Sequence, residues 1–124
     1  SLMRTLNPAR LVDTRASGAT TDNRYEHTAL LVANATNTYQ ITNRFPVAHA
    51  NVAVLNITVA GPASSGFLTV WPCDQTKPNA SSLNYVAGVN RAVQVLTKLS
   101  PSGTVCIASS KATHLIVDVN GTTM

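Results

Sequence analysis

Residues 50–59 have the sequence ANVAVLNITV, in which the side chains alternate with a period of two. One set is wholly apolar and the other is mixed: the first is Ala53, Leu55, Ile57 and Val59, and the second is Val52, Val54, Asn56 and Thr58. Successive side chains of a β-strand point to opposite faces of its sheet. The alternation therefore predicts a strand with one face against a core and the other toward solvent, as is typical of antiparallel sheets.

Shorter stretches of the same kind recur along the 124 residues, a length that fits one domain. We expect strands at 9–14, 27–33, 39–42, 50–59, 67–71, 81–86, 93–99, 104–108 and 114–119. Turn signals rich in Gly, Pro, Ser and Asn separate them, and no segment of ten residues shows a helical period. This pattern predicts an all-β fold: a single-domain, jelly-roll-like antiparallel β-sandwich of eight or nine strands that spans residues 1–124.

Two turn signals make local predictions. The sequence Ser100-Pro101-Ser102-Gly103 predicts a tight turn that pairs 93–99 with 104–108 as a hairpin. The dipeptide Asn120-Gly121 is expected to end the last strand.

Charged residues make up only 11% of the chain, and Thr, Ser and Asn supply the remaining polarity. The net charge is +4, but the nine basic residues are scattered, with no basic run and no interleaved aromatics. Nucleic-acid binding favours a basic patch or stripe, so we expect no such partner. No apolar run approaches the roughly 20 residues of a membrane helix, so membrane insertion is not expected.

Cys73 and Cys106 are the only cysteines, and neither belongs to a CxxC unit, so zinc ligation has no support. Together with the composition, the even number favours a disulfide, which implies an oxidising compartment. The alternative is two buried free thiols in a cytosolic protein.

Six stretches follow one another in the order PARLVDTR (8–15), VLNIT (54–58), GFLTVWPC (66–73), PNASSLNY (78–85), VCI (105–107) and HLIVDVNG (114–121). This order resembles the "PARLVDTR … GFLTVWPC … SNLNY … DVNGYF" module of secreted and cell-surface bacterial proteins, common in actinobacteria. The resemblance implies an extracellular or cell-surface β-rich module, often repeated or appended to hydrolases. One departure is that Gly121 precedes Thr122-Thr123-Met124, where the family usually has an aromatic pair.

The residues give little support to catalysis. There is no GxSxG motif, and the expected strand at 114–119 places His114 and Asp118 on one face, as ordinary strands also do. Asp13 and Asp118 would serve as a catalytic or calcium pair, or as structural partners of Arg15 and Arg10. The structural role is the stronger expectation, because buried charges are normally paired. We therefore expect no catalytic residues, no metal and no cofactor.

Sugar binding needs an exposed aromatic platform with a few planar polar groups. Trp71 and Tyr85, with Asp74, Asn84 and Arg91 close in sequence, are the candidate ligand-binding residues. Strand ends such as that at Trp71 often carry binding loops. The alternative is that Trp71 and Tyr85 belong to the core.

The expected function is that of a non-catalytic extracellular module that binds carbohydrate or another cell-wall or surface polymer and targets a larger protein. The alternative is a structural module of a surface layer, filament or particle, whose partners are further copies of the chain in a homo-oligomer.

Overall fold

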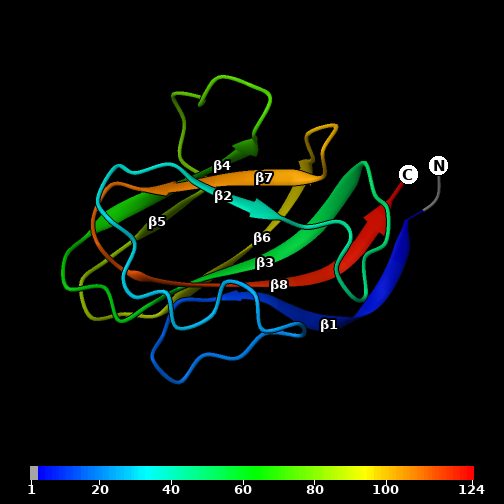
Figure 1. Ribbon diagram of the computed structural model, residues 1–124. Helices are drawn as coiled ribbons and strands as arrows, with labels where there is room; N and C mark the ends of the chain where they lie inside the picture. The colour runs from blue at the N-terminus through cyan, green and yellow to red at the C-terminus, as the bar shows by residue number, and fades with distance from the viewer. Residues whose placement is uncertain (1–2) are drawn as a thin grey trace.

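The computed structural model describes residues 3–124 and contains eight strands and no helix in that range (Figure 1). The strands are β1 (Arg4–Asp13), β2 (Asn37–Gln40), β3 (Val52–Ala60), β4 (Gly66–Pro72), β5 (Leu83–Tyr85), β6 (Arg91–Lys98), β7 (Thr104–Ser109) and β8 (His114–Thr123). Within these residues, no helix is long and apolar enough to cross a membrane.

The strands form two four-stranded antiparallel sheets that pack as two layers (Figure 1). The strand order is β1-β8-β3-β6 in the first sheet and β2-β7-β4-β5 in the second. The pairs β1·β8, β2·β7, β3·β6 and β4·β5 are nested, which is the winding of a jelly roll. The predicted fold class is thus confirmed.

The core lies between the two sheets, and β3 contributes its apolar face to it. Ala53, Leu55, Ile57 and Val59 are fully buried, whereas their neighbours on the outer face are partly exposed. The burial pattern of β3 is therefore the one that the alternation of residues 50–59 predicts.

The predicted hairpin at Ser100–Gly103 is wrong. β6 and β7 belong to different sheets, and the turn between them carries the chain from one layer to the other. Gly103 closes this turn with a φ of 81°, and its N–H donates to the Ser100 carbonyl at 2.8 Å. Its missing side chain is also required, because a Cβ there would overlap Thr42.

The last strand does not end at Asn120-Gly121. β8 continues to Thr123, and Gly121 pairs with Val54 while Val119 pairs with Leu55, so that Asn120 forms a bulge. At the same end of the sandwich, Arg4 of β1 pairs with Thr122, which brings the two ends of the described chain side by side (Figure 1).

The strand expected at 27–33 is also absent; only Leu31 forms an isolated bridge, with Thr113. This segment belongs to the long β1–β2 connection. That connection covers the side of the sandwich where the edge strands of the two sheets, β1 and β2, lie (Figure 1). Asn23, Tyr25, His27 and Ala29 have positive φ angles between 55° and 72°. Left-handed backbone of this kind is costly for residues other than glycine and is incompatible with a strand.

Candidate functional site

The disulfide between Cys73 and Cys106 is present, with 5.1 Å between the Cα atoms. It joins the end of β4 to the neighbouring strand β7 on the outer face of the second sheet. There it packs with Trp71 and Ala108 in a small apolar cluster that is separate from the main core.

Trp71 is only 5% exposed, so it does not form the expected binding platform. The loop after β4 folds back beside it: Ser82 donates from its N–H to the Leu68 carbonyl, and the Lys77 Nζ lies 6.0 Å from the indole centroid. The sequence correctly places Trp71 at a strand end, but this loop and the disulfide bury the ring.

Tyr85 is also buried, at 2% exposure, and its hydroxyl pairs with the Ser109 hydroxyl at 2.7 Å. Asp74, Asn84 and Arg91 are exposed, but no hydrogen bond or ion pair joins them to one another in the described chain. The predicted ligand site is therefore not assembled, because both of its aromatic residues pack inward.

Asp13 and Asp118, the acidic residues expected to have structural roles, both form ion pairs with arginines. The fully buried Asp13 accepts from Arg15 at 2.9 Å and lies 3.5 Å from Arg10, which pairs with Asp118 at 2.9 Å. The hydrogen bond from Arg15 is the main reason why the pKa of Asp13 is lowered. The Arg10–Asp118 pair ties β1 to β8, whereas the contacts of Asp13 with Arg10 and Arg15 are local.

His114 is engaged in the same junction rather than with Asp118. Its Nδ1 lies 2.9 Å from the Thr14 hydroxyl oxygen. Among residues 3–124, no three His, Cys, Asp or Glu side chains are grouped so that they would hold a metal ion.

A further buried ion pair anchors a turn that the sequence does not single out. The Arg44 side chain is fully buried, donates to both Asp22 carboxylate oxygens at 2.7 and 2.8 Å, and donates to the Gln40 carbonyl at 3.1 Å. Its guanidinium also lies over the Tyr25 ring at 5.1 Å. The hydrogen bond from Arg44 is the main reason why the pKa of Asp22 falls to about 2.

The turn anchored in this way presents Phe45 to solvent. Two main-chain hydrogen bonds between Arg44 and Val47 close the turn, and the Thr21 hydroxyl donates to the Phe45 carbonyl at 2.9 Å. Phe45 is nevertheless 79% exposed, whereas Trp71, Tyr39 and Tyr85 are buried. The fold thus holds an aromatic side chain outside the core on a turn fixed by main-chain bonds and a buried ion pair.

A groove of about 610 Å³ separates this turn from the first half of β1. We call it the Phe45 groove; its lining includes Phe45, Pro46, Arg4, Asn7, Arg10 and Thr21. Arg4 and Asn7 are exposed and offer planar hydrogen-bonding groups beside the ring. A lone aromatic residue in a loop without strand alternation is the one signal in the sequence that points to this site.

No family model and no curated protein sequence matches the chain.

Proposed function

We propose that this protein is a non-catalytic extracellular module that binds carbohydrate of a cell wall or cell surface through the Phe45 groove. The observation that carries the proposal is the 79% exposure of Phe45 on a turn held by the buried Arg44–Asp22 pair. The apolar face of a sugar ring packs well against such an aromatic side chain. Arg4 and Asn7 would then hydrogen-bond the sugar hydroxyls.

The bonds that hold the main chain of this turn support the same proposal. A binding group that is already fixed loses little conformational entropy when the ligand arrives. The extracellular location is supported by the disulfide, which is compatible with an oxidising compartment.

Replacing Phe45 by alanine should weaken binding to cell-wall glycan about fivefold, because one aromatic contact of this kind contributes about 1 kcal/mol. The free energy of unfolding should change by less than about 0.5 kcal/mol, since the side chain is exposed. Binding to a glycan array and thermal unfolding measure the two effects.

Phe67→Ala is the matched control, because Phe67 is the only other phenylalanine and is 43% exposed on the outer face of β4. It should leave glycan binding unchanged. Equal affinities of the wild type and Phe45→Ala for every bound glycan would refute the proposed site.

One observation favours self-assembly as a second function: the edge of β6 is open. β6 pairs with β3 without interruption, and no other described strand pairs with it. The Leu99 N–H donates to the Asn51 carbonyl at 2.8 Å, so the main-chain groups of Leu99 point toward β3. Along an antiparallel ladder, residues whose main-chain groups point to the partner alternate with residues whose groups point away from it. The N–H and C=O groups of Ala92, Gln94 and Leu96 therefore point outward, where a second copy would pair with them, while the Lys98 carbonyl already accepts from the Thr97 hydroxyl at 2.9 Å.

Pairing through β6 should appear as a concentration-dependent dimer in analytical ultracentrifugation. Higher salt should strengthen it, because Arg91 and Lys98 at the two ends of the strand repel their counterparts. Gln94→Pro should abolish it by removing an outward donor without removing a bond to β3, whereas Gln94→Ala should not. A monomer at all concentrations and salt levels would exclude this function.

A further inference from the structure

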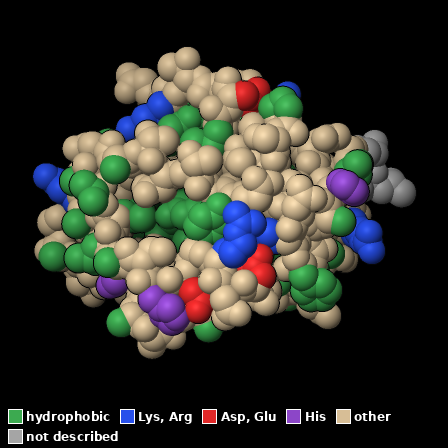
Figure 2. All heavy atoms as spheres, viewed as in Figure 1, with side chains coloured by type: hydrophobic (Ala, Val, Ile, Leu, Met, Phe, Trp, Pro, Cys, Tyr) green, Lys and Arg blue, Asp and Glu red, His purple; other side chains and the backbone are tan. Residues whose placement is uncertain are grey.

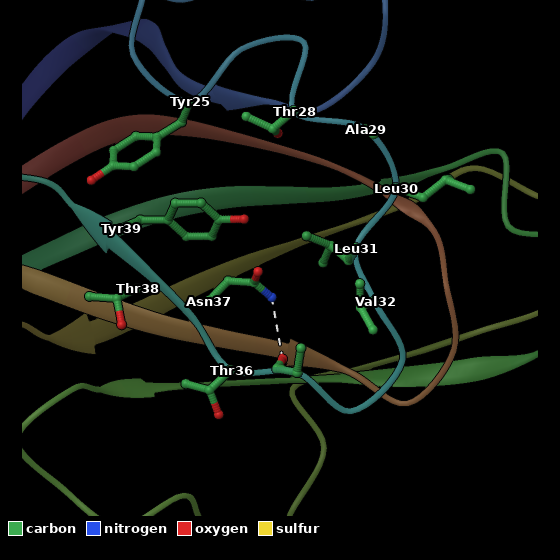
Figure 3. A pocket seen from close by; sticks show the side chains of 11 residues that line it. Tyr25, Thr28, Ala29, Leu30, Leu31, Val32, Thr36, Asn37, Thr38 and Tyr39 are labelled. Atoms are coloured by element: carbon green, nitrogen blue, oxygen red, sulfur yellow. Dashed lines mark hydrogen bonds between the residues drawn. The ribbon is translucent and has the colours of Figure 1, made fainter.

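A second groove lies at the edge strand β2, between β2 and residues 25–32 of the preceding connection (Figure 3). We call it the Tyr39 groove; its volume is about 410 Å³, and none of its eleven lining residues is charged. Figure 2 shows apolar side chains gathered in a hollow across the middle of this side of the molecule. The absence of charge favours an uncharged ligand.

Tyr39 brings an unused polar group into this groove. The residue is only 7% exposed, yet its hydroxyl makes no hydrogen bond with the described residues. Because no fully buried polar side-chain atom in the described chain lacks a partner, this hydroxyl must reach solvent. In Figure 3 it points away from Thr38, toward Leu31.

Burial is the main reason why the pKa of Tyr39 rises to about 12. The hydroxyl therefore keeps its proton at neutral pH and remains a donor.

The main chain of Thr38 supplies a second pair of polar groups. The Gln40 N–H donates to the Tyr25 hydroxyl at 3.0 Å, away from β7, and the next residue, Ile41, donates back to Gly103. This alternation directs the Thr38 N–H and C=O to the same open side as those of Gln40. No residue of the described loops pairs with them.

The open edge of β2 is short, and its length favours a ligand with a single amide group over a peptide strand. Gln40 is already engaged, since its N–H is held by Tyr25 and its carbonyl accepts from Arg44 at 3.1 Å. Within β2, only Thr38 therefore remains free on this side. An added peptide strand needs several such residues in succession, whereas a single amide group needs only one.

The walls are fixed in advance. The N–H groups of His27, Ala29 and Leu31 donate to the carbonyls of Asp13, Thr14 and Thr113 at 2.9–3.1 Å. These bonds hold the left-handed segment in place beside β2. Leu31 points toward Tyr39 (Figure 3), and Val32 beyond it is 70% exposed, so the two form an apolar wall of the groove.

We propose that the Tyr39 groove binds the acetamido group of an N-acetylated sugar. A trans secondary amide points its N–H and its C=O in opposite directions. It can therefore reach an acceptor, the Thr38 carbonyl, and a donor, the Tyr39 hydroxyl, at the same time. Its N–H donates to the Thr38 carbonyl, and its C=O accepts from the Tyr39 hydroxyl. Its methyl group packs against Leu31 and Val32.

Titration with N-acetylglucosamine, followed by NMR, tests the proposal, with glucose as the matched sugar that lacks the acetamido group. We expect N-acetylglucosamine, but not glucose, to shift the NMR signals of the Thr38 amide and the Tyr39 ring. Tyr39→Phe should weaken this binding about five- to tenfold, the effect of losing one hydrogen bond. Its melting temperature should stay unchanged, because the lost hydroxyl has no partner in the fold.

Phe45→Ala separates this site from the Phe45 groove. It should leave the response of Thr38 and Tyr39 to N-acetylglucosamine intact, so either site can fail without the other. Equal shifts with glucose, or an unchanged affinity in Tyr39→Phe, would overturn the proposal. Tighter binding of an N-acetylated tetrapeptide amide would also overturn it, because the groove would then be a peptide site.

Discussion

Reducing the bond between Cys73 and Cys106 should lower the free energy of unfolding by about 4 kcal/mol. The bond closes a loop with a sequence separation of 33 residues, and opening it restores the conformational entropy of that loop to the unfolded chain. The loop contains β5 and β6, so the constraint acts on a large part of the chain. For a domain of this size, the melting temperature should fall by roughly 15 °C.

Trp71 is the only tryptophan and packs beside the bond, so its fluorescence follows unfolding directly. Denaturant titrations with and without reductant measure the difference. The double variant Cys73→Ala/Cys106→Ala is the control, because reductant should leave its stability unchanged. A loss of less than about 1 kcal/mol on reduction would contradict the chain-entropy explanation.

Asp22→Ala should lower the free energy of unfolding by about 3 kcal/mol. The Arg44 side chain is fully buried, and without Asp22 its charge would keep only the Gln40 carbonyl and the Tyr25 ring as partners. Leaving a buried charge unpaired is among the most destabilising single changes. Asp74→Ala is the matched control: Asp74 is exposed, so its removal should cost less than about 0.5 kcal/mol.

The acid dependence of stability provides an independent check. The pKa of Asp22 is about 2 in the folded protein, below its ordinary value of 3.8. A carboxyl group whose pKa is lowered by folding stabilises the protein above the unfolded pKa and loses this effect as the pH falls through the folded pKa. The stability gap between the wild type and Asp22→Ala should therefore narrow between about pH 5 and pH 2. A gap that stays constant over this range would show that the ion pair is not its cause.

Much of the fold follows from local patterns in the sequence. The alternation of residues 50–59 identifies a half-buried strand because side-chain direction along a strand is a local property. The Ser100–Gly103 turn shows the limit: its residues specify a reversal of the chain, but not whether the next strand joins the same sheet or the opposite one. The irregular course of residues 27–33 is likewise imposed by main-chain bonds to Asp13 and Thr14.

The candidate sites depend more strongly on tertiary contacts. Asp13, Arg15 and Asp118 could be predicted as structural because buried charges require partners. The burial of Trp71 could not be predicted from the sequence, because it depends on how the loop after β4 folds back. Phe45 is a lone aromatic residue in a loop in the sequence, but its support on a turn held by Asp22, 22 residues before Arg44, depends on a tertiary contact.

The adjacent ends of the described chain have a mechanical consequence. A pulling force applied to both ends acts first on the pair formed by Arg4 and Thr122 and then opens the β1–β8 ladder one pair at a time, as a zipper opens. Ladders loaded in this way yield at lower force than ladders that are sheared, whose bonds must break together. The Cys73–Cys106 bond would then limit the extension, because force passes through the bond and the 33-residue loop that it closes, roughly 110 Å of extended chain, is not stretched. The molecule would thus yield readily at β1 and β8 while the chain between the two cysteines stays unloaded.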